Sequence, residues 1–427
     1  MEQKVSEEKI KILTISDHPL SPSGVGTQTK YMIEAMLDTK KFKFVCLGGA
    51  IKHENYQPSQ VEPYGEDWII FPIDGYGNEE VIRSMIRTHK PDILWFMTDP
   101  RFYEWLWGIE NEIRPLVPMV YYHVWDNYPY PDYNKSYYIS NDFIATISKV
   151  TDDIVKTVAP GVDSQYLPHS VNTEIFKKHE EELVEKFREE ILNDEHEGKF
   201  ILFWNNRNAR RKQTGSVVWW YKELLDRIGN DKTTLILHTE PKDPHGQDLE
   251  VLISTLGMKS EQILISPNKI PPEHLSLLYN IVNCTVNIAD AEGFGLGTLE
   301  SLACETPIVV NMTGGLQEQV TDGEEFFGVG ITPVSRSVIG SQTVPYIYED
   351  RINNVEFVDA LEKMYNMWND HPEEYAELGK KGRQHVLKNY NYEKFKDSWE
   401  KVLLEVHEKH GSWDNRKNHK SWELIEV

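Results

Sequence analysis

The sequence has 427 residues, which is long enough for two domains that each bury a hydrophobic core. Apolar residues make up 40% of the chain and charged residues 26%, which is typical of a soluble globular protein. The formal net charge of -23 argues against a broad nucleic-acid surface and against docking on anionic lipid, although it allows one local basic pocket.

Two features of the sequence bear on location. No apolar run reaches membrane-spanning length, and the charged residues of stretch 1–11 are unlike a signal peptide. The cysteines, Cys46, Cys284 and Cys304, stand in apolar surroundings without the spacing of a metal site. We therefore expect reduced core thiols in a cytoplasmic protein that has no transmembrane anchor.

The first predicted elements are a strand, a glycine-containing loop and a helix. Residues 11–16 form a short apolar run of buried-strand character, and a helical pattern covers residues 31–36. Gly24 and Gly26 lie between them, with a spacing that differs from the dinucleotide fingerprint, so a bound NAD is not implied. A tight turn that needs positive φ is the alternative explanation for these glycines. The order of elements predicts a doubly wound α/β domain.

The following strands, at residues 42–47, 68–72, 93–97, 117–122 and 144–148, continue this pattern. His123 comes directly after one of them, and ligands of α/β sheets collect beyond the carboxyl ends of strands. A structural histidine is the alternative. The aromatic run 102–109 fits a helix face, which favours core packing over an acceptor pocket or a helix that dips into a membrane.

A new strand at residues 200–204 leads into a loop rich in basic residues. Arg207 and Lys212 lie in this loop, and their cationic side chains suit phosphate oxygens. A solvated basic loop is the alternative. Such a concentration of positive charge in an acidic protein favours an anionic partner.

The most informative stretch is a glycine-rich loop between two carboxylates that stand eight positions apart, Glu292 and Glu300. Backbone N–H groups of such a loop can approach a ligand closely, and a carboxylate can accept two hydroxyl donors of a sugar. A solvated helix start with favourable glutamates is the alternative. The loop and a second one that follows it contribute these candidate binding residues: Gly293, Phe294, Gly295, Leu296, Gly314, Gly315 and Glu318.

The two glutamates and the Gly-Gly-x-x-Glu run at residues 314–318 resemble the motifs of retaining GT-B glycosyltransferases, in particular family 4 of that group (glycosyl transferases group 1). The resemblance implies a GT-B fold, with two Rossmann-like doubly wound domains that face a central cleft. It also implies that Glu292 holds the donor hexose, that Glu300 holds the ribose, and that loop 314–318 lies at the sugar and diphosphate.

The same resemblance implies roles for residues elsewhere in the chain. The loop with Gly24 and Gly26 would lie against the donor phosphates, and His123 would contact the sugar near its anomeric centre. Arg207 and Lys212 keep the family's Arg–Lys spacing, although Asn206 stands where the family has glycine. These two side chains would neutralise the diphosphate as it leaves.

We expect the domain boundaries near residues 180 and 390. Residues 1–180 form an N-terminal acceptor-side domain with the linker, and residues 181–390 form the nucleotide-sugar domain. Residues 391–427 provide a helix that crosses back to the N-terminal domain, where Trp399 suits the packing, and then a loosely held tail from residue 411. Residues 322–350 are expected to be irregular, with a mobile loop at residues 335–344.

The function that the resemblance implies is retaining transfer of a hexose from a nucleoside diphosphate sugar, with a UDP-sugar such as UDP-glucose favoured. The acceptor is not identified, and neither a metal nor another cofactor is expected. A GT-B epimerase or phosphorylase is one alternative, since it shares the fold but acts on a different bond. A non-catalytic protein that binds sugar nucleotides is the other.

Overall fold

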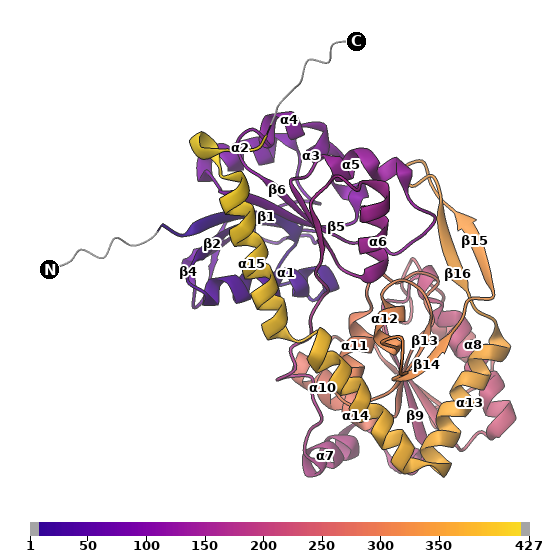
Figure 1. Cartoon of the computed structure of the whole chain (residues 1–427). Coiled ribbons are helices and arrows are strands. Elements are labelled where there is room, and N and C mark those ends of the chain that lie inside the picture. The colour runs from indigo at the N-terminus through magenta and orange to yellow at the C-terminus, as the bar shows by residue number, and fades with distance from the viewer. Residues whose placement is uncertain (1–7, 420–427) are drawn as a thin grey trace. The chain divides into compact units, whose positions relative to one another are not determined.

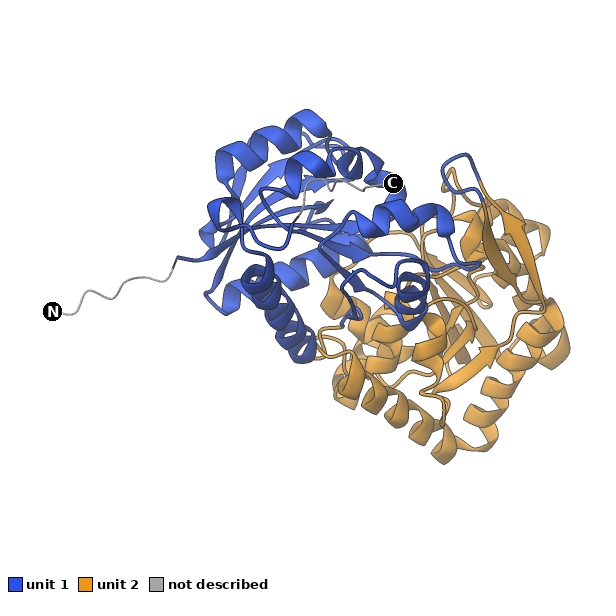
Figure 2. Ribbon diagram, turned by 45° about the horizontal axis from the view of Figure 1, so that its top comes forward, with its two compact units in different colours: residues 1–170, 341–345, 392–427 blue, residues 171–340, 346–391 orange. Residues whose placement is uncertain are grey.

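The computed structural model describes residues 8–419 of a chain that divides into two compact units (Figure 2). Unit 1 contains Met1–Ser170, Ser341–Pro345 and Tyr392–Val427, and unit 2 contains Val171–Gly340 and Tyr346–Asn391. The division after Ser170 comes earlier than the expected boundary near residue 180, because the main-chain N–H of Val171 already bonds the carbonyl of Tyr390 inside unit 2.

Unit 1 is built on an eight-stranded sheet in the order β3-β4-β2-β1-β5-β6-β7-β8, in which only β3 and β4 pair antiparallel. The strand order reverses at β1, which lies between β2 and β5, so the carboxyl end of β1 is a topological switch point. The strands are β1 (Ile10–Asp17), β2 (Phe42–Gly49), β3 (Ser59–Val61), β4 (Gly65–Pro72), β5 (Ile93–Thr98), β6 (Met119–His123), β7 (Phe143–Thr146) and β8 (Ser164–Tyr166).

Helices cover the sheet of unit 1, as the buried apolar strands of a parallel sheet require. They are α1 (Gly24–Asp38), α2 (Glu79–His89), α3 (Glu104–Gly108), α4 (Glu110–Ile113), α5 (Lys135–Ile139), α6 (Lys149–Val158) and α15 (Tyr392–His410). The terminal helix α15 packs against α1 in this unit (Figure 1). Its Trp399 is fully buried and meets Trp95 and Tyr122 edge-on, with ring centroids 5.8 and 5.0 Å apart.

The aromatic run after β5 forms a 3₁₀ turn, η1 (Pro100–Phe102), and then the short helix α3. Tyr103 and Leu106 are fully buried, and Trp107 is 5% exposed. The Tyr103 hydroxyl is 2.8 Å from the carbonyl oxygens of both Ile15 and Met97. The core-packing interpretation of this run is therefore confirmed.

The expectation of a loosely held tail is wrong for residues 411–419, and residues 420–427 lie outside the described part. Here η5 (Trp413–Asn415) follows α15. The Ser412 hydroxyl donates to Asp92 at 2.7 Å, and Arg416 donates to Asp142 at 2.8 Å and to the carbonyl of Arg114 at 2.7 Å. These side chains fasten the segment to unit 1, and the local sequence gave no sign of their distant partners.

Unit 2 has a six-stranded parallel sheet in the order β11-β10-β9-β12-β13-β14. Its strands are β9 (Phe200–Asn205), β10 (Thr233–His238), β11 (Ile263–Ser266), β12 (Cys284–Asn287), β13 (Ile308–Asn311) and β14 (Gly328–Ile331). The strand order reverses at β9, so the loops after β9 and β12 leave the same edge of the sheet side by side.

The helices and 3₁₀ turns of unit 2 are α7 (Glu181–Ile191), η3 (Asp194–His196), η4 (Arg210–Lys212), α8 (Thr214–Ile228), α9 (Leu249–Thr255), α10 (Pro272–Ile281), α11 (Leu296–Ala303), α12 (Leu316–Val320), α13 (Asn354–Asp370) and α14 (Pro372–Asn389). In Figure 1, α8 and α13 pack together, and so do α11 and α14. The core between the sheet and α8 and α13 contains Trp204, Leu224 and Phe357.

Residues 322–350 are not the irregular segment that the sequence predicts. They contain β14, which extends the main sheet, and a separate hairpin of β15 (Ser335–Ile339) and β16 (Ile347–Arg351). The hairpin is anchored at β16, where the amide of Asn311 donates to the carbonyl of Asp350 and the Thr313 hydroxyl donates to its carboxylate, both at 2.8 Å. The hairpin was missed because its strands expose many side chains and so lack the apolar alternation of a half-buried strand.

Every helix within residues 8–419 is either too short or too polar to cross a membrane. Cys46, Cys284 and Cys304 are free thiols, and each is buried.

Candidate functional site

Three neighbouring strands of unit 2 bring the predicted donor-site residues to one edge of the sheet. The loops after β9, β12 and β13 carry the basic residues, the first glutamate and the Gly314–Gly315 pair, respectively. The carboxyl ends of adjacent parallel strands meet at this edge, which is where α/β sheets bind ligands.

Lys212 and Glu292 form a buried ion pair across two of these loops. Lys212, the last residue of η4, donates to Oε2 of Glu292, and the amide of Asn287 donates to the same oxygen at 3.2 Å. Glu292 is only 8% exposed, and its burial favours the neutral acid, but the charges of Lys212 and Arg211 outweigh burial and lower the pKa. Glu292 is therefore an anion whose charge is balanced inside the protein.

The other basic side chains of this loop bind different partners. Arg211 donates to the carbonyl of Ala291 at 2.5 Å, and the N–H of Asp290 donates to the carbonyl of Arg211 at 2.8 Å, which ties the loops together. Arg210 pairs with Glu349 on β16. Arg207 points its guanidinium at Asp243, with Nε 2.6 Å from Oδ2, and is 61% exposed. The structure thus brings Lys212, but not Arg207, into contact with Glu292.

Glu300 lies on α11 and belongs to a chain of neutral hydrogen-bonding groups. The Tyr279 hydroxyl donates to Oε2 of Glu300 at 3.0 Å and accepts from the amide of Asn205 at 2.9 Å. Burial raises the pKa of Glu300 to about 7, although the hydrogen bond from Tyr279 opposes the shift. A Cβ on Gly297 would lie 3.3 Å from both the Tyr279 hydroxyl and the carbonyl of Asn205, so a side chain there would press on these two groups.

Asn205 and Tyr279 were missed in the sequence because they come from β9 and α10 and meet only in the folded unit. Tyr279 looked like an apolar position of a helix, and its hydroxyl partner is not predictable from helical periodicity. Asn205 is a polar residue at the carboxyl end of an apolar strand, and this position was the sequence feature that could have identified it.

The glycine-rich loop is held by the loop that follows β13. Gly295 has a φ of 91°, in the left-handed region that favours glycine, and a Cβ on Gly315 would lie 2.6 Å from Cα of Phe294. The amide of Gln319 donates to the carbonyl of Phe294 at 2.7 Å and accepts from the Thr298 hydroxyl at 2.7 Å. The predicted residues Gly293, Phe294, Gly295, Gly314 and Gly315 therefore lie in two loops whose segments are bonded to each other, and Leu296 is the first residue of α11.

Glu318, the third predicted glutamate, is buried on α12 and contacts α14 and the residue after it. The Tyr390 hydroxyl is 3.3 Å from Oε1 of Glu318 and 3.1 Å from its carbonyl oxygen, which also bonds Nε2 of His385 at 2.8 Å. These contacts fix the helix and orient the carboxylate. A direct contact between Glu318 and a ligand stays a prediction.

In unit 1, His123 is fully buried at the end of β6, between two tyrosine hydroxyls. Its Nδ1 is 3.0 Å from the Tyr121 hydroxyl and its Nε2 is 2.8 Å from the Tyr138 hydroxyl. Tyr121 donates its proton to the carbonyl of Thr98 at 2.6 Å, so it accepts from Nδ1–H of His123. Nε2 is then the acceptor of the Tyr138 proton, and burial lowers the pKa of His123 to about 3.

The main chain is strained beside this histidine. Thr98, the last residue of β5, has a φ of 152°, which a β-branched residue rarely adopts. Such outliers concentrate at functional sites. No pattern in the sequence marks this residue.

The loop after β1 is shaped by contact distances and not by φ. Neither Gly24 nor Gly26 has a positive φ, but a Cβ on Gly26 would lie 2.5 Å from Oγ of Ser21. The Ser23 hydroxyl caps α1 at the N–H of Gly26 and donates to Asp17 at 2.5 Å. The alternative explanation, a turn that needs positive φ, is therefore wrong, although the contact of this loop with donor phosphates stays a prediction.

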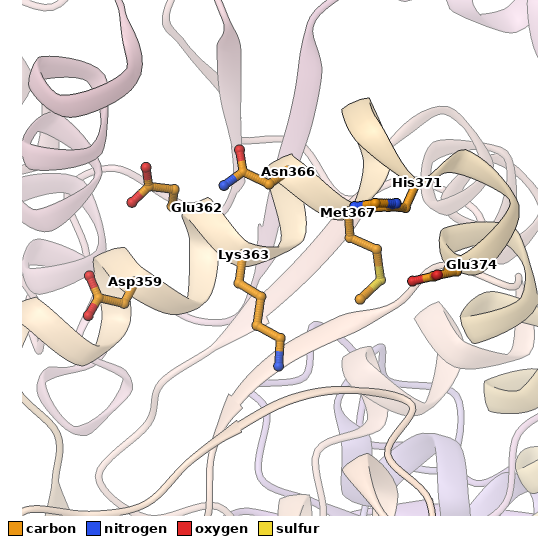
Figure 3. Close-up of a pocket in the computed structure, with 7 residues that line it drawn as sticks. All are labelled: Asp359, Glu362, Lys363, Asn366, Met367, His371 and Glu374. Atoms are coloured by element: carbon orange, nitrogen blue, oxygen red, sulfur yellow. The ribbon is translucent and has the colours of Figure 1, made fainter.

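A surface hollow on α13 and α14 lies apart from all these side chains. Figure 3 shows its lining, which consists of Asp359, Glu362, Lys363, Asn366, Met367, His371 and Glu374. Asp359 and Glu362 pair with Arg227, at 2.5 and 2.9 Å. The hollow contains no residue from the loops that follow β9, β12 or β13, so it is not part of the candidate site.

Comparison with known proteins gives a family match for the part of unit 2 that includes Glu292 and Glu300. Residues 228–385 match the family described as Glycosyl transferases group 1. D-inositol 3-phosphate glycosyltransferase from Acidothermus cellulolyticus is 38% identical over 86 residues, which cover 20% of this chain and 18% of that protein.

Solved structures resemble the chain over nearly its whole length. Sucrose-phosphate synthase from Thermosynechococcus elongatus has a TM-score of 0.73 at 15% identity, covering 94% of this chain and 100% of that chain. HepE from Anabaena in complex with UDP and glucose has a TM-score of 0.66 at 13% identity, covering 92% and 99%. The chain thus has the GT-B fold, and its residues 228–385 are similar to the glycosyl transferases group 1 family.

Proposed function

We propose that this chain transfers a hexose from a nucleoside diphosphate sugar to a hydroxylated acceptor, with retention of configuration at the anomeric carbon. The observation that carries the proposal is the buried Lys212–Glu292 pair, which joins two adjacent loops. Glu292 and Glu300 lie within residues 228–385, which match the glycosyl transferases group 1 family. A UDP-sugar, in particular UDP-glucose, is the proposed donor, and the similarity to HepE crystallised with UDP and glucose supports it.

The proposed donor site uses the two glutamates for different tasks. When the donor binds, the Lys212 ammonium leaves Glu292 and donates to a phosphate oxygen of the donor. Arg211 adds positive charge from the same loop. Glu292 then accepts hydrogen bonds from hexose hydroxyls. Glu300 accepts from the ribose hydroxyls beside Tyr279.

The proposed chemistry breaks the bond between the anomeric carbon and the diphosphate and forms a bond from that carbon to the acceptor oxygen. The departing phosphate oxygen takes the acceptor proton. His123 is unsuited to that task, because its pKa is lowered to about 3 and its Nε2 already accepts a proton from Tyr138. We therefore assign His123 a hydrogen-bonding role, and not that of a base.

We also propose that the leaving diphosphate is stabilised by protein cations without a divalent ion. Lys212 and Arg211 carry the charge that this step needs, and the sheet edge of unit 2 holds them close to Glu292. Turnover should therefore survive EDTA. Loss of turnover that added Mn²⁺ restores would contradict this assignment. A cytoplasmic location is likewise proposed, on the strength of the three free thiols.

The experiment that tests the function combines ligand binding with product analysis. UDP-, GDP- and ADP-sugars are screened by thermal shift, where a ligand at 100 times its Kd adds about 2.7 kcal/mol of stability. The UDP-sugar should raise the Tm of the native chain but not that of the Lys212→Ala variant. If no sugar nucleotide binds, the proposal fails.

Product analysis separates the remaining possibilities. Proton NMR of the first product made from an α-linked donor should show an α-anomeric signal. A β signal would refute retention, and turnover of the donor without an acceptor would favour an epimerase or phosphorylase. Binding with neither transfer nor hydrolysis would make the chain a non-catalytic sugar-nucleotide binder.

A further inference from the structure

A tyrosine-rich segment follows His123 in unit 1 and plays no part in the proposed donor site. Residues 125–133 read Trp-Asp-Asn-Tyr-Pro-Tyr-Pro-Asp-Tyr and connect β6 to η2 (Asp132–Asn134). We call this segment the tyrosine loop. It begins at the carboxyl end of β6, the edge at which doubly wound sheets bind ligands, and the Trp125 ring lies 6.3 Å from the His123 ring.

The base of the tyrosine loop is fixed to the body of unit 1. Trp125 is 4% exposed, and its indole N–H donates to the carbonyl of Asn127 at 2.8 Å. The carbonyl of Trp125 accepts from the Thr151 hydroxyl on α6 at 2.6 Å. Both α6 and β6 belong to unit 1. The loop is therefore held at a defined place beside His123.

The two tyrosines at the centre of the loop are held by a single carboxylate. The hydroxyls of Tyr128 and Tyr130 lie 2.7 and 2.9 Å from the same Oδ2 of Asp153 on α6. Their rings meet edge to face, with centroids 5.3 Å apart and an interplanar angle of 84°. Tyr130 is 39% exposed. Because both hydroxyls are bound, the ring planes are fixed, and a ligand that stacks on them need not order them.

The charges near these rings favour one chemical class of ligand. The tyrosine loop contains Asp126 and Asp132, and Asp153 adds a third carboxylate beside the tyrosines. The nearby cations are Lys135, which follows the loop at the start of α5, and Arg101, which faces Asp126 but already pairs with Asp99. A phosphorylated ligand needs cationic or N–H donors at its phosphate, and it is repelled by carboxylates. An uncharged sugar instead offers hydroxyl donors to carboxylates and an apolar C–H face to aromatic rings.

We propose that the tyrosine loop binds the acceptor, that this acceptor is an unphosphorylated saccharide, and that one of its rings stacks on Tyr130. The inference rests on the proposed transferase function and specifies its acceptor. It distinguishes this chain from similar proteins whose names contain a phosphorylated compound, D-inositol 3-phosphate glycosyltransferase and sucrose-phosphate synthase.

The test uses the full chain and matched pairs of sugars: glucose with glucose 6-phosphate, and mannose with mannose 6-phosphate. Maltose and cellobiose are included as unphosphorylated disaccharides. Binding is measured by saturation-transfer NMR, with and without saturating UDP. We expect the unphosphorylated member of each pair to bind more tightly, and its ring protons to receive magnetisation from the tyrosine loop.

Variants of the loop identify the contact. Tyr130→Ala should weaken sugar binding about threefold to tenfold, the size of a stacking contribution. Tyr130→Phe keeps the ring but loses its hydrogen bond to Asp153, so it should weaken binding less than Tyr130→Ala does. Asp153→Ala frees both hydroxyls and should weaken the same sugars. Trp219→Ala removes a comparably exposed aromatic ring, 47% exposed on α8, and is the control that should change nothing.

The outcomes separate this inference from the proposed function. The Kd for UDP, measured by calorimetry, should be equal in the native chain and in all four variants. If the phosphorylated sugars bind more tightly, if no unphosphorylated sugar binds, or if Tyr130→Ala binds as well as the native chain, the inference is wrong. If UDP fails to bind while the sugars do, the donor assignment fails and the tyrosine loop stands as a saccharide site.

Discussion

The carboxyl edges of the two sheets use opposite electrostatics. In unit 2 the segments at this edge are joined by full charges: Lys212 with Glu292, Arg210 with Glu349, and Arg351 with Asp290. In unit 1 the edge around His123 is joined by neutral groups, the hydroxyls of Tyr121 and Tyr138. The two edges follow the same strand–loop–helix plan, so the difference comes from the side chains of the loops and not from the fold.

Because their loop side chains differ, two sheets of the same architecture can bind two kinds of ligand. A charged edge can exchange an internal partner for a phosphate, since both are anions that bind the same cation. The edge around His123 is held by neutral groups, and it presents hydroxyl groups, aromatic faces and carboxylates such as Asp126 and Asp153, which suit an uncharged sugar.

The largest effect should come from Lys212→Ala, because it leaves the buried carboxylate of Glu292 without its cation. Loss of one partner of a buried pair costs about 3–5 kcal/mol of unfolding free energy. Urea unfolding of the variant measures the loss. The double variant Lys212→Met, Glu292→Gln should regain most of the stability without regaining UDP affinity. Equal losses in the single and double variants would mean that the pair is not coupled.

At the neutral edge, Tyr138→Phe should leave Nε2 of His123 buried without a donor, at a cost of about 1–3 kcal/mol. The lowered pKa of His123 also predicts the sign of a pH effect. Its contribution to stability is present above the unfolded value of about 6.5 and is lost as the pH falls toward 3, because only the unfolded chain takes up a proton there. NMR of the imidazole should show the Nδ1–H tautomer at neutral pH. A titration midpoint near 6 would contradict the burial argument.

The affinity for UDP should depend on pH through Glu300, whose pKa is raised to about 7 by burial. Ribose hydroxyls need the ionised carboxylate as an acceptor, so binding should strengthen about tenfold from about pH 6 to about pH 8 and then level off. Calorimetry across this range measures the effect. Glu300→Gln should bind UDP more weakly and show a flat profile. A native profile as flat as that of the variant would remove Glu300 from the ribose site.

The smallest effect should come from Asp243→Asn, which releases the 61% exposed Arg207 side chain from its ion pair. Exposed pairs contribute about 0–1 kcal/mol, so stability should hardly change. If Arg207 turns from Asp243 to the diphosphate, UDP affinity should rise up to about threefold in Asp243→Asn and fall in Arg207→Ala. Unchanged UDP affinity in both variants would leave Arg207 as a surface residue.

Local patterns of apolar residues predicted most of the fold, because apolar positions in the sequence are the ones that become buried. The apolar runs at residues 11–16 and 200–204 became the central strands β1 and β9, since strands covered on both faces must be apolar throughout. The β15–β16 hairpin escaped prediction because its exposed strands lack that pattern. Its position depends on contacts such as Asn311 with Asp350, which are distant in sequence.

The candidate site could be predicted where a motif fixes the local geometry, as at Gly295, whose left-handed φ needs glycine. It could not be predicted where function depends on pairing between elements. The sequence presents Arg207 and Lys212 alike, yet one is 61% exposed beside Asp243 and the other is buried against Glu292. The tyrosine hydroxyls that surround His123 give no periodic signal either.

The internal balance of charge between Lys212 and Glu292 has a kinetic consequence. Because the cation is already cancelled, the approaching donor experiences the overall field of a chain with a formal net charge of -23. An anionic sugar nucleotide is therefore slowed during diffusion toward this protein. Added salt screens that repulsion over a Debye length of about 8 Å at physiological ionic strength. The association rate constant for UDP-glucose should consequently increase with salt, the reverse of what an open cationic phosphate site would give.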